Sequence, residues 1–174
     1  VVIPPPASGG AAANQRLVYV ASGSLPFQIA GYTIRTHQLL KAFVASGVDA
    51  VCLTRPGYPW DRPRALAGGH PIDETHEVDG VTYIHTQLDG RSGGEDLIWE
   101  ASDALERRFR ALGAGIVQAA SNRRNALPAL IAARRIGAKF IYEVRGLWEL
   151  TAATRLSGWE KTERYRLDRD LEVL

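Results

Sequence analysis

The fold of this chain is constrained most by a regular alternation of short apolar runs with longer amphipathic segments. Runs rich in β-branched residues occur at 16–21, 48–54, 81–86, 115–120 and 139–144. Most of them are apolar at nearly every position, which is the pattern of strands buried on both faces of a sheet. The sequence therefore predicts five buried strands.

The segments between these runs have the spacing of amphipathic helices. One helical face would carry Tyr32, Thr36, Leu39, Leu40, Phe43 and Val44, with Gly47 as a C-cap. A second helix is expected over 98–112, ended by Gly113, and a third after Asn122, ended by Gly137. Pro128 fits this third helix only within its first turn.

Strands that alternate with helices in this way form right-handed βαβ units. The predicted fold class is therefore α/β, a Rossmann-like open parallel sheet with helices on both faces. Residues 16–174 are expected to form one domain, because a chain of 174 residues can bury one sizeable core. Residues 1–15, with their Pro and Gly/Ala runs, are interpreted as a flexible lead-in.

Two further stretches affect the expected domain organisation. The stretch 55–79 is rich in Pro and Gly, shows no convincing long element, and is expected to be a functional or mobile loop. Residues 158–174 have the pattern of a helix, with no cap or breaker where the sequence stops. We therefore expect the parent protein to continue into a further domain.

Composition and charge argue against several classes of function. The formal net charge of +2 predicts no strong attraction to nucleic acid. The single cysteine, Cys52, lies in an apolar run and is expected to be a buried small residue, and the lack of a disulfide framework suits a reducing cytoplasm. No apolar stretch is long enough to span a membrane. Asp168 and Asp170 are not spaced with any His or Cys as metal ligands would be, so no metal site is predicted.

In open α/β sheets, ligands bind at the carboxyl ends of the strands. No G-x-G-x-x-G motif follows the first strand, which argues against a dinucleotide-dependent oxidoreductase or a nucleotide-sugar epimerase. Gly31 instead opens the next helix, where it and its neighbours Tyr32 and Thr33 would offer backbone N–H groups to an anion, with Arg35 on the first turns. The alternative is that Gly31 only makes a turn. His37 fits a surface or packed histidine better than a catalytic one.

The loops after the second and fourth strands allow two interpretations each. Tyr58 and Trp60 could stack on a sugar or could plug the end of the sheet. Ser121 or Asn122 can cap the next helix, with Arg123 beside them, or can contact a ligand.

The end of the last strand carries three charged residues, Glu143, Arg145 and Glu149. An arginine and a glutamate this close can bind the hydroxyl and phosphate groups of a substrate, or can pair with each other as a structural bridge. Because the cluster lies where a ligand should bind, we favour a binding role.

An ordered series of motifs resembles a known protein family. These motifs are the pair AG at 30–31, HQLLKAFVASGVDAVCLTRPG at 37–57, DGVTYIHT at 79–86, GIVQAASNRRNALPALIAARRIGAKFIYEVRG at 115–146, and GLWE at 146–149. Together they resemble the N-terminal domain of the family 4 (group 1) retaining glycosyltransferases over nearly all of residues 16–174. Two departures are that the family's glycine pair is Ala30 and Gly31 here, and that Ala120 stands where many members carry a functional histidine.

The resemblance implies the acceptor-side half of a two-domain (GT-B) enzyme. Such an enzyme transfers a sugar, with retention, from a nucleotide-sugar donor to a glycan, lipid or small-molecule acceptor, and polysaccharide or surface glycan biosynthesis in bacteria is the expected pathway. The resemblance also implies a C-terminal donor-binding domain in the parent chain, no activity of this fragment alone, and no metal or other cofactor. The expected location is the cytoplasm, with peripheral association of the parent enzyme at the inner face of the membrane.

The resemblance, together with the loops described above, nominates the site residues. We expect catalytic roles for Asn122 and Arg145, and substrate-binding roles for Gly31, Tyr32, Thr33, Arg35, Arg123 and Glu149. The alternative function is a non-catalytic Rossmann-like ligand-binding or regulatory domain, because a fold does not fix a function.

Overall fold

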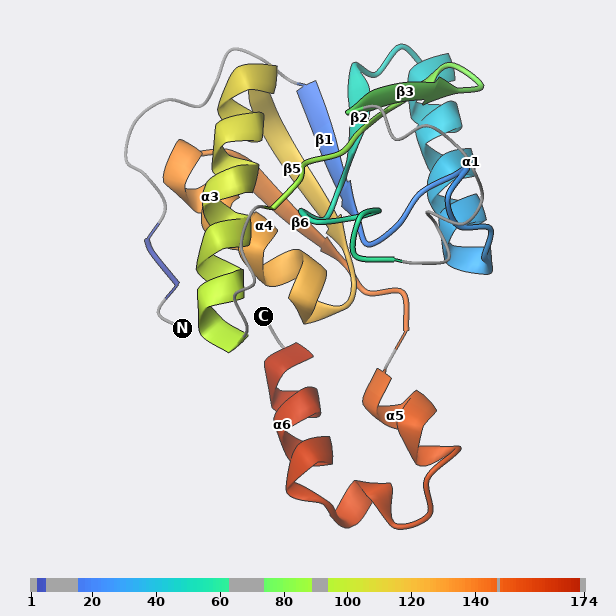
Figure 1. Ribbon diagram of the computed structural model, residues 1–174, viewed down its shortest axis with the longest axis vertical. Helices are drawn as coiled ribbons and strands as arrows, with labels where there is room; N and C mark the ends of the chain where they lie inside the picture. The colour runs from blue at the N-terminus through green and yellow to red at the C-terminus, as the bar shows by residue number, and fades with distance from the viewer. Residues whose placement is uncertain (1–2, 6–15, 63–73, 89–93, 147, 173–174) are drawn as a thin grey trace.

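The computed structural model describes residues 3–5, 16–62, 74–88, 94–146 and 148–172. A six-stranded sheet in the order β3-β4-β2-β1-β5-β6 forms the centre of the molecule (Figure 1). Its strands are β1 (Arg16–Ala21), β2 (Ala50–Thr54), β3 (Thr75–Val78), β4 (Val81–Ile84), β5 (Ala114–Ala120) and β6 (Lys139–Glu143). All neighbouring strands are parallel except β3 and β4, which form an antiparallel hairpin.

Helices cover both faces of this sheet, as predicted. On one face α1 (Gly31–Ala45) packs Leu40 against a cluster that includes Tyr19, Cys52 and Tyr83. On the other face α3 (Gly94–Leu112) and α4 (Arg123–Ile136) bury a second cluster of apolar side chains. Figure 1 shows α1 on one side of the strands, with α3 and α4 together on the other. The chain thus changes face between β1 and β5, which creates the crevice where such folds bind ligands.

The helices α1, α3 and α4 end at the glycines that the sequence predicted. Gly47, Gly113 and Gly137 all have positive φ angles, between 65° and 80°, a backbone conformation that residues with a Cβ seldom adopt. Pro128 departs from the expectation, because α4 begins at Arg123 and Pro128 therefore lies in its second turn. The proline has no N–H to donate to the carbonyl of Arg124, so the helix contains one hydrogen bond fewer at this point.

The predicted open parallel sheet is confirmed, and it carries one antiparallel strand at an edge. β3 lies within the stretch 55–79, in which no long element was expected, and it adds an antiparallel strand outside β4. Its side chains alternate between exposed and half-buried, as on an edge strand with one face open to solvent. Of that stretch, residues 63–73 lie outside the described residues.

The single helix predicted over 158–174 is broken. Gly158 has a φ of 76° before the short 3-10 helix η1 (Trp159–Lys161), and Thr162 is extended, so α6 spans only Glu163–Glu172. The preceding α5 (Trp148–Ala153), η1 and α6 pack on one another and extend away from the sheet (Figure 1). Of the expected lead-in at 1–15, only residues 3–5 are among those described.

Candidate functional site

The carboxyl ends of the five parallel strands meet at one edge of the sheet, and most of the predicted site residues lie there. The amino-terminal turn of α1 is the first part of this edge. Ala30 is extended and its N–H donates to Thr33 Oγ1 at 2.9 Å, while the Thr33 hydroxyl lies within hydrogen-bonding distance of the carbonyls of Gln28 and Ala30. The Thr33 side chain is therefore buried in the helix cap and not directed at a ligand.

The backbone of this turn remains available. Ile34 N–H is the first to bond within the helix, to the carbonyl of Ala30, so the N–H groups of the preceding turn have no intrahelical partner. The φ of Gly31 lies outside the left-handed region, and an added Cβ would meet no described atom within 4 Å. The described chain itself therefore gives no conformational or packing reason for a glycine at this position. Tyr32, the next residue, is 40% exposed.

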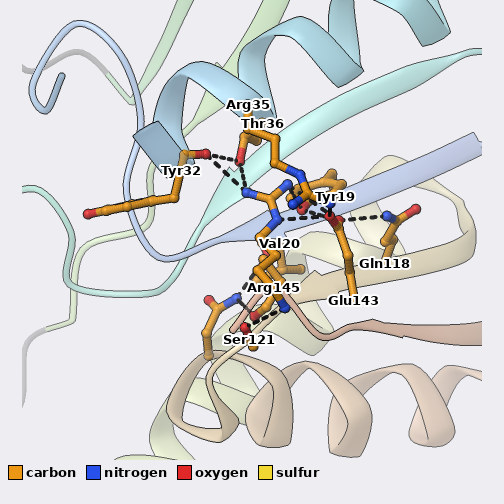
Figure 2. A network of polar contacts seen from close by, with 11 residues as sticks. Tyr19, Val20, Tyr32, Arg35, Thr36, Gln118, Ser121, Glu143 and Arg145 are labelled. Atoms are coloured by element: carbon orange, nitrogen blue, oxygen red, sulfur yellow. Dashed lines mark hydrogen bonds and ion pairs between the residues drawn. The ribbon is translucent and has the colours of Figure 1, made fainter. Parts of the chain in front are cut away.

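A buried polar network joins this turn to the end of β6 (Figure 2). Arg145 donates from Nε to Glu143 Oε1 at 2.9 Å and from a terminal nitrogen to the Tyr19 hydroxyl. Its other terminal nitrogen donates to Thr36 Oγ1 at 2.6 Å and to the carbonyl of Tyr32 at 3.0 Å. The side chain of Arg145 is only 9% exposed, so its charge is almost wholly enclosed by these groups.

Glu143 is the acceptor at the centre of this network. Besides Arg145, its carboxylate accepts from the Tyr19 hydroxyl at 2.6 Å, from Gln118 Nε2 at 3.0 Å and from Arg35 at 3.2 Å. Burial alone would raise the pKa of Glu143, but the hydrogen bonds from Arg145 and Tyr19 outweigh it and lower the pKa. Burial, and then the bond to Glu143, raises the pKa of Tyr19 far above its ordinary value. Glu143 is therefore ionised and Tyr19 neutral at neutral pH.

The amino terminus of α4 forms the next part of the edge. Asn122 accepts from the N–H of Arg124 at 3.1 Å, so its side chain caps the helix, which is one of the two roles predicted for it. Ser121 accepts from the N–H of Arg145 at 3.0 Å. Asn125 donates to the carbonyls of Val20 and Ala120, and so ties the ends of β1 and β5 together.

The loop after β2 is held by an aromatic and histidine cluster. Tyr58 is fully buried and donates to the carbonyl of Ser24, so it plugs this end of the sheet and its ring is closed to a ligand, whereas Trp60 is half-buried. Beneath them His85 Nε2 lies 3.1 Å from His76 Nδ1, and the two rings stack 4.9 Å apart. His76 Nε2 donates to the carbonyl of Leu25 at 2.8 Å, and His85 Nδ1 accepts from the Thr54 hydroxyl at 2.8 Å.

The structure separates the predicted residues into groups. It brings Arg35 and Arg145 together with the first turns of α1, where Gly31, Tyr32 and Thr33 lie. Arg123 is the first residue of α4, and Glu149 is on α5, where its side chain is outside the described residues.

Two other residues follow the interpretations preferred from the sequence. His37 is packed, with its ring bonded to the Tyr83 hydroxyl at 2.9 Å and to Asp79 at 3.2 Å. Cys52 is buried, which raises the pKa of its thiol. Within the described part of the chain, no group of three or more His, Cys, Asp or Glu side chains could hold a metal ion, and no described helix is long and apolar enough to cross a membrane.

Sequence reasoning missed several members of the site, namely Tyr19, Thr36, Gln118, Asn125 and the pair His76 and His85. One signal was available for Tyr19 and Gln118, because each places a polar group inside an otherwise apolar strand. A polar atom at such a position needs a buried partner.

Comparison with known proteins identifies the family of the chain. Residues 30–171 match the family model described as glycosyl transferase 4-like domain. The chain belongs to this family. The match begins at the first turn of α1 and includes Glu143 and Arg145, but not Tyr19 of β1.

Solved structures support the same fold. Sucrose-phosphate synthase from Thermosynechococcus elongatus superposes with a TM-score of 0.59 at 11% sequence identity, over 90% of this chain and 39% of that chain. A second structure bearing the name of that enzyme covers 90% of this chain and 99% of its own at 13% identity, but its TM-score of 0.44 is too low to support an argument. A search of curated proteins finds no match. The glycosyl transferase 4-like chain thus has the Rossmann-like fold of one half of a GT-B enzyme, and it spans about two fifths of the length of the synthase.

Proposed function

We propose that this chain is the acceptor-side domain of a GT-B glycosyltransferase, and that the first turn of α1 faces the phosphate groups of a nucleotide-sugar donor. The observation that carries the proposal is Gly31. This glycine opens a 15-residue helix, yet neither its φ nor its described surroundings require a glycine. A ligand that approaches the backbone closely explains the missing side chain, and the N–H groups of the turn, which have no intrahelical partner, would favour an anion there.

The charges of the surrounding loops support an anionic substrate. The loops after β2 and β6 and the amino-terminal turns of α1 and α4 contain the described arginines Arg35, Arg55, Arg62, Arg123, Arg124 and Arg145, which could attract an anion. In the proposed reaction the oxygen of an acceptor hydroxyl forms a bond to the anomeric carbon, the bond from that carbon to the diphosphate oxygen breaks, and the hydroxyl proton passes to the leaving diphosphate. Helix N–H groups and arginines would stabilise the negative charge that develops on the leaving diphosphate. No metal is needed for this role.

The finer parts of the proposal rest on the family resemblance. They are retention of configuration, a glycan, lipid or small-molecule acceptor, bacterial polysaccharide or surface glycan assembly, a cytoplasmic location at the membrane, and a donor-binding domain elsewhere in the parent protein. Asn122 and Arg145 are proposed to serve the reacting centre directly or through their neighbours. Arg123 and Glu149 are proposed to contact the acceptor.

The test is a transfer assay on the full-length parent enzyme with a panel of nucleotide sugars, measuring release of the nucleotide. We expect turnover by the parent and none by residues 1–174 alone. Gly31→Val should lower kcat/KM at least about tenfold by blocking the approach to the turn, whereas Ala42→Val, a matched change at an exposed position of the same helix, should leave it within about twofold. If the parent turns over no nucleotide sugar, the proposal fails and a non-catalytic binding domain becomes the better reading. Turnover by the isolated chain would refute the half-enzyme assignment.

A further inference from the structure

Two arginines share the single carboxylate of Glu143, and their surroundings differ sharply. The guanidinium of Arg145 bonds to the side chains of Glu143, Tyr19 and Thr36 and to a backbone carbonyl, and the side chain is 9% exposed. Arg35 reaches Glu143 at 3.2 Å, and its side chain is 62% exposed. One arginine is therefore enclosed by the protein, while the other faces solvent.

Glu143 does not depend on Arg35 for its hydrogen bonds. Both of its carboxylate oxygens accept from Arg145, and one of them also accepts from Tyr19 and Gln118. Arg35 can therefore move away from Glu143, because both carboxylate oxygens keep other hydrogen bonds. The group formed by Arg35, Arg145 and ionised Glu143 has an excess positive charge, because the hydroxyl of Tyr19 is neutral. That excess favours an additional anion beside Arg35.

Arg145 connects three elements through a single side chain and its backbone. Its terminal nitrogen donates to the Tyr32 carbonyl and to Thr36 Oγ1, and the Thr36 hydroxyl in turn donates to the Tyr32 carbonyl at 2.9 Å. Its backbone N–H donates to Ser121, in the loop after β5 (Figure 2). The first two turns of α1 are thus tied to the end of β6 by a planar fork of donors, a geometry that lysine cannot reproduce.

We propose a division of roles between the two arginines: Arg145 is a positioning residue that holds the amino-terminal turn of α1 in place, and Arg35 exchanges Glu143 for an anionic oxygen group of the substrate, a phosphate or a carboxylate. The exchange by Arg35 rests on the proposed function, which assigns this turn to the substrate. The positioning role of Arg145 does not depend on that function.

The positioning role of Arg145 at the amino-terminal turn of α1 is tested by amide hydrogen exchange on the 174-residue chain. Arg145→Met should accelerate exchange of the helix-bonded amides at 34–36 by about tenfold or more, whereas Arg35→Met should leave it within about twofold. Arg145→Lys keeps the charge but loses the planar fork of donors, and should give an intermediate acceleration. This variant replaces Arg145→Met in the test if Arg145→Met does not fold. Slow exchange at 126–133, in the buried part of α4, shows that each variant is folded. Equal acceleration by Arg35→Met and the Arg145 variants would overturn the division of roles.

The proposed replacement of Glu143 by an anion beside Arg35 is tested by measuring the binding of two probes to the same chain. The probes are inorganic pyrophosphate, for a donor diphosphate, and glucuronate, for an acidic acceptor. We expect one of them to bind, and Arg35→Met to weaken it at least about fivefold while Arg35→Lys retains most of the affinity. The probe that responds identifies the source of the anion. Binding of neither probe, or binding unchanged in Arg35→Met, overturns the role of Arg35. Neither measurement involves sugar transfer, so a parent enzyme without turnover would sink the proposed function and leave these results standing.

Discussion

The buried histidine pair makes a quantitative prediction about acid stability. His76 and His85 form a chain of hydrogen bonds from the Thr54 hydroxyl to the carbonyl of Leu25, and His85 is fully buried. In its neutral arrangement His85 donates from Nε2 and His76 accepts at Nδ1, because His76 already donates from Nε2 to Leu25. Adding a proton places a charge in the core. Arg108, which bonds to Thr86 and Glu74, also donates to the backbone carbonyl of His85 at 3.5 Å. Burial, and then the neighbouring His76, lowers the pKa of His85 from 6.5 to about 4.

The size and sign of the effect follow from linkage. Because the folded-state pKa of His85 is depressed, the unfolded state binds more protons between pH 6.5 and about 4, and stability falls as the pH drops through that window. Between pH 7.5 and 5.0 this single group should lower the free energy of unfolding by about 2 kcal/mol. Carboxylates contribute little over this range, because even unfolded Asp and Glu remain largely ionised at pH 5. The urea midpoint should therefore fall by roughly 1 M.

The assay is urea unfolding of the 174-residue chain at pH 7.5 and pH 5.0, followed by circular dichroism. His85→Gln keeps an amide N–H near the position of Nε2 but cannot be protonated. This variant should be less stable at pH 7.5, and its stability should change between the two pH values by less than half as much as that of the wild type. His37→Gln is the matched control, because it removes another buried imidazole but leaves the pair intact. An equal acid-dependent loss in wild type and His85→Gln would show that the pair is not its origin.

Three further predictions concern a helix end, a cap and the absence of a metal. Gly47→Ala should cost about 1 kcal/mol of stability because φ is 80° there, whereas Gly31→Ala should cost nothing measurable in thermal unfolding. Equal losses would contradict the conclusion that the backbone requires a glycine at position 47 but not at position 31. Asn122→Ala should also cost about 1 kcal/mol as a lost helix cap, and a loss of transfer in the parent enzyme much larger than this would show that Asn122 contributes to the chemistry as well. EDTA should leave transfer by the parent enzyme unchanged, so activity that disappears with chelation and returns with Mg²⁺ would refute the metal-free proposal.

The sequence predicted the buried strands well because their signal is local. The run at 16–21 coincides with β1, and the other four predicted strands agree with observed strands to within two residues at each end. β3 was missed because THEV alternates polar and apolar residues over only four positions, and such a short run is recognisable as a strand only once β4 is present to pair with it. The break at Thr162 was missed because the charge spacing across 158–174 is compatible with one continuous helix.

The candidate site was predictable only in part, for a related reason. Glu143 and Arg145 lie two positions apart, so their proximity followed from the sequence. Their partners Tyr19 and Thr36 lie more than one hundred positions away from Arg145, and only the assembled sheet with α1 packed on it brings them together. The sequence therefore allowed two roles for Arg145, substrate contact or structural bridge. Only the burial of its side chain in the structure distinguishes between them.

The amino-terminal turn of α1 is held by two buried polar groups of opposite character. The neutral histidine pair fixes the loop before the helix through Leu25, and the charged pair Glu143 and Arg145 fixes the first turns of the helix itself. Acid should therefore release them in sequence. Neutral His85 loses its contribution to stability as the pH falls from 6.5 towards about 4. Ionised Glu143, whose pKa is lowered, keeps its contribution until the pH falls below the pKa of an ordinary carboxyl group. Near pH 5 the loop at Leu25 should consequently exchange its amide hydrogens faster, while the helix-bonded amides from Ile34 onward stay protected. Simultaneous loss of both would mean that the two groups form one cooperative unit.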